Sequence, residues 1–354
     1  MSHFEQRLEA DLGQIRDFVW NMGEDVQNAL LNAKRALLTR DEELAYATVL
    51  QDNPINRASR ACDRMCHTFI ARHLPGAGHL REMAATIRVN VALERMGDYA
   101  VTISRESLQL PEELPEIFVL QIDALADDVL QILHDSRVAF RDDNAEAAKV
   151  LMKSAKRVEG KMDAIYDILF DDERQIGARA ALTIFVVFNL LKRVADQAKN
   201  ICDQTVYAVR GVAKIPKVYH FLFVDRPGSG AGQLAVAIGR KVYPTSATFD
   251  VAIAGERQAV SPELAKFLGE TGLPAEELES QSLHLLESDF SDYDVIISLA
   301  GKTREHIDRI PFHTSALDWA LPESEGSGEL DSQYRVLRSE ITELMDLLAG
   351  EEAA

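Results

Sequence analysis

Apolar residues recur at intervals of three and four positions through most of the first 210 residues, a spacing that places them on one face of a helix. The first such run predicts a long amphipathic helix over residues 4–38. Its apolar positions include Leu8, Leu12, Ile15, Val19, Met22, Val26 and Leu30. A second predicted helix starts after Asp41, a suitable N-cap residue, and extends to about residue 73 with a kink or break near Pro54. A third covers about residues 80–108.

The same pattern begins again after the proline-marked linker at residues 110–116, and it predicts helices over about 117–140, 141–169 and 178–209. The segment LERMGDYAVTI at residues 93–103 returns as LKRVADQAKNI at residues 191–201, with five of the eleven letters unchanged. Two matched sets of three helices predict two related three-helix bundles, over residues 1–110 and 111–212. One irregular helical array is the alternative.

The pattern changes after residue 216. Short β-rich apolar segments at residues 218–224, 247–255 and 293–301 alternate with helical stretches. This alternation predicts a small doubly wound α/β domain over residues 217–354. The expected fold class is therefore multidomain, with all-α tandem three-helix bundles followed by a small α/β domain built on a parallel sheet.

Composition favours a cytoplasmic protein that does not bind nucleic acid. The N-terminus shows no secretory signal, and the longest apolar run, at residues 181–191, is only about half a membrane span. Three cysteines cannot form a disulfide framework; Cys62 and Cys66, with His67 beside them, are a ligand short of a closed zinc site, which favours core cysteines. The net charge of −19 makes a direct contact with nucleic acid or an anionic membrane unfavourable, so membrane association is expected only through partners.

The repeated helix carries the first candidate chemistry. Glu94 and Asp98 lie four positions apart, so they share one helix face, where adjacent carboxylates repel unless a cation lies between them. The matching row in the second copy has Asp196 and Asp203, but Lys192 replaces Glu94. Hard cations accept such oxygen ligands. A solvated helix face is the alternative interpretation.

Several motifs resemble those of the PhoU family of phosphate-uptake regulators: LERMGDYAVTI, DNPINR at residues 52–57, ARHLPGAGHLR at residues 71–81, and LKRVADQAKNI. The likeness covers about residues 3–212. It implies a pair of three-helix bundles that communicates between the ATPase of a phosphate ABC transporter and a sensor histidine kinase, as a negative regulator of phosphate homeostasis. It also implies metal binding (Mg, Mn, Fe or Zn) through acidic motifs on the bundle surface.

Carried over residue by residue, the resemblance implies metal ligands at Glu94, Asp98, Asp52 and Asn56 in the first bundle and at Asp196 and Asp203 in the second. His79 stands at a customary Asp, and Ala155 and Glu159 stand where an acidic pair is usual. Lys192 can neutralise Asp196 internally and compete with a metal. We therefore expect weak divalent-metal binding in the first bundle and little or none in the second.

The segment FLFVDRPGSGAGQLA at residues 221–235 reads as a strand, a Gly-rich turn and a helix N-terminus, which is a general anion cradle. With its neighbouring strands it resembles the low-molecular-weight tyrosine phosphatase and arsenate reductase family. Those enzymes need a Cys nucleophile and an Arg around this loop, but Asp225 and Ala231 stand there, and no cysteine occurs after Cys202. The other residues of this degenerate anion loop are Gly228, Ser229, Gly230 and Gly232.

The general-acid segment reads WALPESEG, with Ala320 where an Asp is expected and Glu323 nearby. We expect Asp225 to accept hydrogen bonds from the loop's own N–H groups as a resident anion, and the domain to be an inactive pseudo-phosphatase. The leading hypothesis is thus a PhoU-like regulator that is not an enzyme, and we expect it to form a homodimer. The alternatives are a phosphatase or arsenate reductase with a helical regulatory domain, and a structural helical adaptor.

Overall fold

The computed structural model describes residues 3–110, 113–169, 176–211, 217–276, 278–286, 290–311, 313–322 and 329–349. The chain divides into two compact units, Met1–Lys214 and Ile215–Ala354. In the part of each helix that the structure describes, none combines the length and the apolar character needed to cross a membrane.

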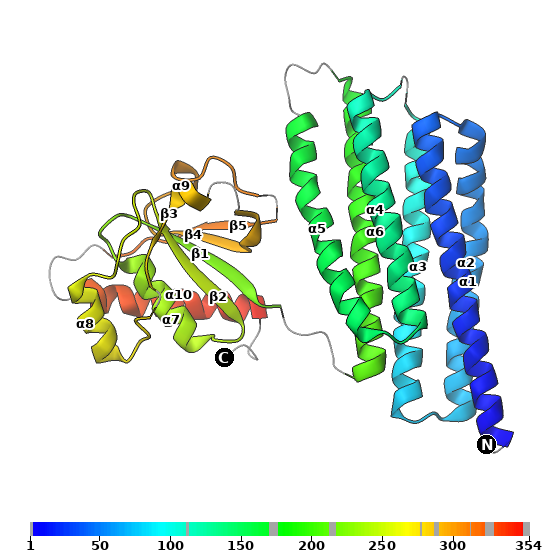
Figure 1. Cartoon of the computed structure of the whole chain (residues 1–354), viewed down its shortest axis with the longest axis horizontal. Helices are drawn as coiled ribbons and strands as arrows, with labels where there is room; N and C mark the ends of the chain where they lie inside the picture. Colours follow the sequence, from blue (N-terminus) through cyan, green and yellow to red (C-terminus); the bar gives the residue numbers. More distant parts are fainter. Residues whose placement is uncertain are drawn as a thin grey trace. The chain divides into compact units, whose positions relative to one another are not determined.

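In its described residues the first unit has six long helices, which lie side by side (Figure 1). They are α1 (His3–Thr39), α2 (Glu42–His73), α3 (Ala77–Ser107), α4 (Glu116–Arg141), α5 (Ala145–Leu169) and α6 (Ala178–Arg210). The Asp41 carboxylate accepts a hydrogen bond from the Leu44 N–H at 2.9 Å, so the predicted N-cap of α2 is confirmed. The helix continues through Pro54, so of the predicted kink or break no break occurs. Pro54 is exposed, where water can satisfy the carbonyl that loses its donor.

Both three-helix sets contribute to one continuous apolar core, in which α3 packs against α6 and α1 against α4. The repeat explains this arrangement, because each third helix presents small residues at matching places. Ala100 and Ala198 are both fully buried, as are the larger Leu93 and Val194 beside them. The two predicted bundles are therefore joined in one helical unit.

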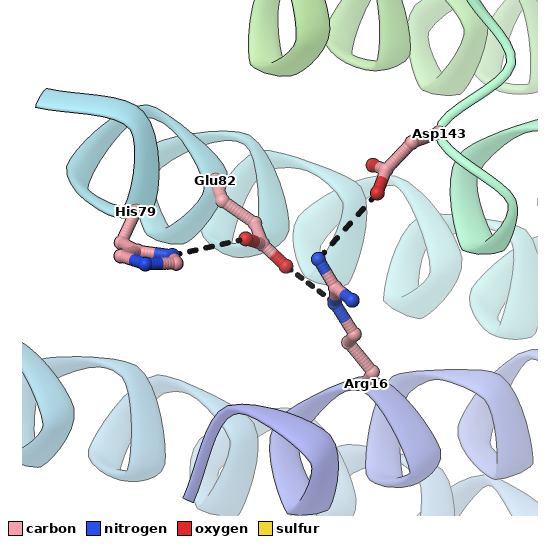
Figure 2. A network of polar contacts seen from close by, with 4 residues as sticks. All are labelled: Arg16, His79, Glu82 and Asp143. Carbon is pink, nitrogen blue, oxygen red and sulfur yellow. Dashed lines mark hydrogen bonds and ion pairs between the residues drawn. The ribbon is translucent and has the colours of Figure 1, made fainter. Parts of the chain in front are cut away.

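A polar network ties the two helical sets together at their surface (Figure 2). Arg16 of α1 donates a hydrogen bond from Nε to Glu82 Oε1 of α3 at 2.6 Å, and its Nη2 lies 3.5 Å from Asp143 Oδ2 in the turn before α5. His79 Nδ1 lies 3.7 Å from the other oxygen of Glu82. His79 is thus engaged in this joint.

The second unit is a five-stranded sheet covered by helices. Its strands are β1 (Tyr219–Asp225), β2 (Ala247–Ile253), β3 (Gln281–Ser282), β4 (Val295–Ser298) and β5 (Ser315–Asp318), and they are all parallel in the order β3-β2-β1-β4-β5. Its helices are α7 (Ala231–Val242), α8 (Pro262–Thr271), α9 (Leu283–Leu286) and α10 (Glu329–Ala349). The predicted doubly wound domain is confirmed; β3 and β5 were not predicted.

The alternation of side chains along β1 builds a core on each face of the sheet. Phe221 and Phe223 pack with residues of α7, α8 and α10, whereas Leu222 and Val224 pack with Phe290 and other residues on the opposite face. Asp225 follows directly at the carboxyl end of this buried strand. Residues 323–328 lie outside the described residues, and α10 begins at Glu329.

Candidate functional site

Two helices of the first bundle bring its predicted metal ligands to one surface. Glu94 and Asp98 lie one turn apart on α3, and Asp52 and Asn56 lie one turn apart on the neighbouring α2. Gly97 allows the two helices to approach, because a Cβ there would lie 3.3 Å from the nearest side-chain atom of α2 and 4.0 Å from Asp52 Oδ1.

Their surroundings disfavour the charged forms of Glu94 and Asp98. Burial raises the pKa of Glu94, and the negative charges of Asp98 and Asp52 raise it further, against an opposing effect of Arg95. Burial also raises the pKa of Asp98, and the charge of Asp52 adds to this. A cation between these side chains would relieve the repulsion.

Asp52 has a buried oxygen without a hydrogen-bond partner among the described residues. Its Oδ2 accepts a hydrogen bond from Asn56 Nδ2 at 2.6 Å, whereas Oδ1 is buried and has no hydrogen-bond partner in the described part of the chain. These oxygen donors suit a hard divalent cation. In their present positions, however, no three His, Cys, Asp or Glu side chains among the described residues are grouped to hold a metal ion, so binding would require side-chain rotation.

The second bundle arranges its polar row differently. Lys192 Nζ lies 3.9 Å from Asp196 Oδ2, so the expected internal pairing of this ammonium with the carboxylate is confirmed. Asp203 instead lines a groove between α3 and α6, which also holds Arg88 and Arg95. Sequence reasoning missed this groove. Ala155 and Glu159 stand where an acidic pair was expected. Ala155 is buried, and the side chain of Glu159 lies outside the described residues.

The cysteines belong to the core. Cys62 and Cys66 are fully buried on α2, and Cys202 is fully buried on α6. His67 is exposed, so it points away from the two neighbouring thiols. The hydrogen bond with the neighbouring Cys66 raises the pKa of the Cys62 thiol, and burial raises it further, which keeps this thiol protonated.

The loop after β1 is filled by its own carboxylate. Asp225 is 3% exposed, and it accepts hydrogen bonds from the Arg226 N–H on Oδ1 and the Gly232 N–H on Oδ2, each at 2.7 Å. Burial raises the pKa of Asp225, although these N–H groups and the Ser229 hydroxyl act against the shift. The expected hydrogen bonds from the loop's own N–H groups to the Asp225 carboxyl are confirmed. Gly228 and Gly230 turn the loop with φ of 84° and 74°, values that favour glycine.

The described residues at the Arg position and at the expected Asp position are both alanines, Ala231 and Ala320. Ala231, at the Arg position, is fully buried. A cleft of about 450 Å³ beside the loop is lined by Arg226, Lys302 and Ala320, among other residues. Asp318, which also lines it, accepts hydrogen bonds from the Thr303 N–H and hydroxyl at 2.7 and 2.6 Å, and these bonds lower its pKa. Glu323 lies outside the described residues.

Known proteins match both helical sets. The PhoU domain matches residues 19–107 and again residues 122–205. The chain is 30% identical over 213 residues to the phosphate-specific transport system accessory protein PhoU of Edwardsiella tarda, an overlap of 59% of this chain and 87% of that protein. The phosphate transport system regulatory protein PhoU from Streptococcus pneumoniae superposes with a TM-score of 0.55 at 25% identity, over 60% of this chain and 100% of that one. An arsenate reductase in the phosphate binding state superposes with a TM-score of 0.31 at 20% identity, over 37% of this chain and 99% of that one.

Proposed function

This chain belongs to the PhoU family, and we propose that it acts in the cytoplasm as a regulator of phosphate uptake and phosphate-starvation signalling. It would contact the ATPase of a phosphate ABC transporter and a sensor histidine kinase. The observation that carries this proposal is the pair of matched helical sets, each of which matches the PhoU domain. The relatives named above are accessory or regulatory proteins of phosphate transport, which supports the same role.

The second unit fits this role as a non-catalytic contact domain. Its loop carries the carboxylate of Asp225 in place of a thiolate nucleophile. This carboxylate already accepts hydrogen bonds from the N–H groups that would otherwise bind an oxyanion. The unit's share of the sequence has a net charge of −13, which also disfavours an anionic substrate. An arylphosphatase activity of the purified chain that Asp225→Ala abolishes would establish the enzyme alternative instead.

The regulatory proposal is tested by deleting the gene and by measuring direct binding. Without the protein, a phosphate-starvation reporter should be expressed in phosphate-rich medium, and the purified full chain should bind the purified ATPase or the kinase. An unchanged reporter together with no binding to either partner would contradict the proposal. Light scattering of the same preparation tests the homodimer that we also propose.

We also propose that Glu94, Asp98 and Asp52 bind a divalent cation weakly, whereas the second bundle binds little or none because Lys192 occupies the equivalent row. Bound metal would neutralise the repelling carboxylates. Replacing Lys192 with Glu should raise the Mn²⁺ content per chain, and without metal it should destabilise the helical unit by about 0.5 kcal/mol through like-charge repulsion. Metal analysis and titration calorimetry measure both sites. The Asp98→Asn variant serves as the counterpart, because it should lose the first-bundle binding; equal Mn²⁺ content in all three proteins would contradict the assignment.

A further inference from the structure

A groove of about 480 Å³ lies between α3 and α6. On the α3 side it is lined by Arg88, Val91 and Arg95, and on the α6 side by Asp203, Gln204 and Tyr207, among others. Because α3 and α6 are the third helices of the two repeats, the groove follows the joint of the paired bundles. None of Glu94, Asp98, Asp52 and Asp225 is among the residues that line it.

Two exposed arginines give the groove positive charge. Arg88 and Arg95 are seven residues apart, which is two helical turns or about 10 Å along the helix axis. Arg88 donates a hydrogen bond from Nη1 to Gln204 Oε1 at 3.4 Å, and its guanidinium lies 5.8 Å from the centre of the Tyr207 ring. Arg95 makes no hydrogen bond or ion pair with any residue that the structure describes, so its donors are open to a partner.

On the α3 side of the groove, the lining residues close to the two arginines are apolar. Val91 is 40% exposed, and Ile87 and Ala92 lie beside it in the groove. Asp203 is the one acidic side chain among the described lining residues, so two positive charges face one negative charge. This balance is opposite in sign to the net charge of −19 on the whole chain. The groove therefore combines a positive charge balance with a short apolar strip on α3.

We propose that this groove is the docking site for an acidic amphipathic helix of a partner protein. Such a helix would place two carboxylates about two turns apart, one on each arginine, and an apolar side chain on Val91 between them. A partner helix fits better than an inorganic polyanion because a polyanion would leave the apolar floor uncovered. The inference rests on the proposed function, since it names the chemistry by which a regulator of this kind would hold its partner.

The test uses the full chain and fluorescence anisotropy with two labelled helical peptides. One peptide has two glutamates seven residues apart with leucines midway, and the other has lysines in place of the glutamates. The acidic peptide should bind and the lysine peptide should not. Charge reversal at both Arg88→Glu and Arg95→Glu should weaken binding by at least about tenfold, because each contact becomes repulsive. Arg35→Glu, at an exposed position of α1, is the matched control and should leave binding unchanged.

The same variants are then compared for binding to the purified transporter ATPase and the sensor kinase. At least one partner should lose affinity with the Arg88 and Arg95 reversal and keep it with Arg35→Glu. The docking inference is overturned if the reversal leaves peptide and partner binding unchanged, if polyphosphate binds these arginines and the peptide does not, or if the reversal only dissociates a dimer. If the Arg88 and Arg95 variant binds a partner as tightly as the original chain does, the proposed function is not contradicted. Peptide binding without binding to either partner would contradict the proposed function alone.

Discussion

At the carboxyl end of β1, the Asp225 side chain accepts hydrogen bonds from two backbone N–H groups, which in a phosphate-binding loop would point at the ligand. The loop has kept its glycine-dependent turn, since Gly228 and Gly230 both have positive φ. What it lacks is a free anion cradle. Asp225 therefore occupies two hydrogen-bond donors of a loop that keeps its glycine-dependent turn.

Asp225→Ala should open this cradle. The Arg226 and Gly232 N–H groups would lose their acceptor, which should lower the free energy of unfolding of the α/β unit by about 2–4 kcal/mol. Inorganic phosphate could then replace the carboxylate, so it should raise the melting temperature of the variant and not that of the original chain. Differential scanning fluorimetry at constant ionic strength measures this, with Asp308→Ala, an exposed position, as the control. Equal stabilisation of all three proteins by phosphate would contradict the resident-anion interpretation.

The raised pKa values of Glu94 and Asp98 predict how pH acts on the first bundle. Because the folded state holds these protons more tightly than the unfolded state, their contribution to stability without metal is greatest below the ordinary values of 4.5 and 3.8 and is lost as pH rises through the folded pKa values. A cation needs the ionised carboxylates, so metal affinity should change in the opposite direction and increase with pH.

This pH dependence is measured as a difference between two proteins. Urea unfolding in a chelator, repeated from pH 7 downward, compares the original chain with the Glu94→Gln and Asp98→Asn double variant; the original should gain stability relative to the variant as pH falls. The difference cancels the contributions of carboxylates that both proteins share. One of these is Asp11, whose pKa is lowered by His73 and Arg72, so its contribution to stability is lost as pH falls. Parallel stability curves would show that the two carboxylates do not interact with their surroundings as described.

At the scale of helices, α1 and α4 are joined by a buried arginine. Arg137 of α4 is 4% exposed; it donates hydrogen bonds to Gln27 Oε1 and Glu24 Oε1, each at 2.6 Å, and to the Trp20 carbonyl at 3.2 Å. Its guanidinium also lies 4.5 Å from the centre of the Trp20 ring. Gly23 makes room for this side chain, because a Cβ there would overlap the Arg137 Nε and lie 3.0 Å from its Cδ and Cζ.

Two glycine substitutions in α1 should therefore have opposite effects. Gly23→Ala should destabilise the helical unit by about 1–3 kcal/mol, because the displaced Arg137 would lose well-placed partners. Gly13→Ala, which meets no atom within 4 Å, should stabilise it by about 0.5–1 kcal/mol through helix propensity. Thermal unfolding followed by circular dichroism compares them. Stabilisation by both substitutions would show that the Arg137 joint is not rigid.

At the scale of the whole molecule, each apolar core is formed by residues of one unit. The helical core draws on α1 to α6, and the two cores of the α/β unit draw on the sheet and its own helices. In the described part of the chain no apolar cluster includes residues of both units. Each unit therefore has the means to fold by itself.

Separate expression of residues 1–211 and 217–354 should yield two folded proteins. Each should unfold cooperatively at a temperature within a few degrees of the corresponding transition in the full chain, because no shared core is removed. Scanning calorimetry of the three proteins makes the comparison. Loss of cooperative unfolding in either fragment would show that the units depend on each other.

Much of this protein is encoded locally in its sequence. Helical periodicity, the Asp41 cap, the buried strand before Asp225 and the repeat all arise from residues close together in the chain, so pattern alone predicts them. The two-residue β3 and four-residue β5 escaped prediction because such short strands carry no periodic signal and form by pairing with neighbours. The meeting of Asp52 with Glu94, and the separation of Asp203 into a groove with Arg88, depend on which helix faces pack together, and that is set by contacts between residues far apart in the chain.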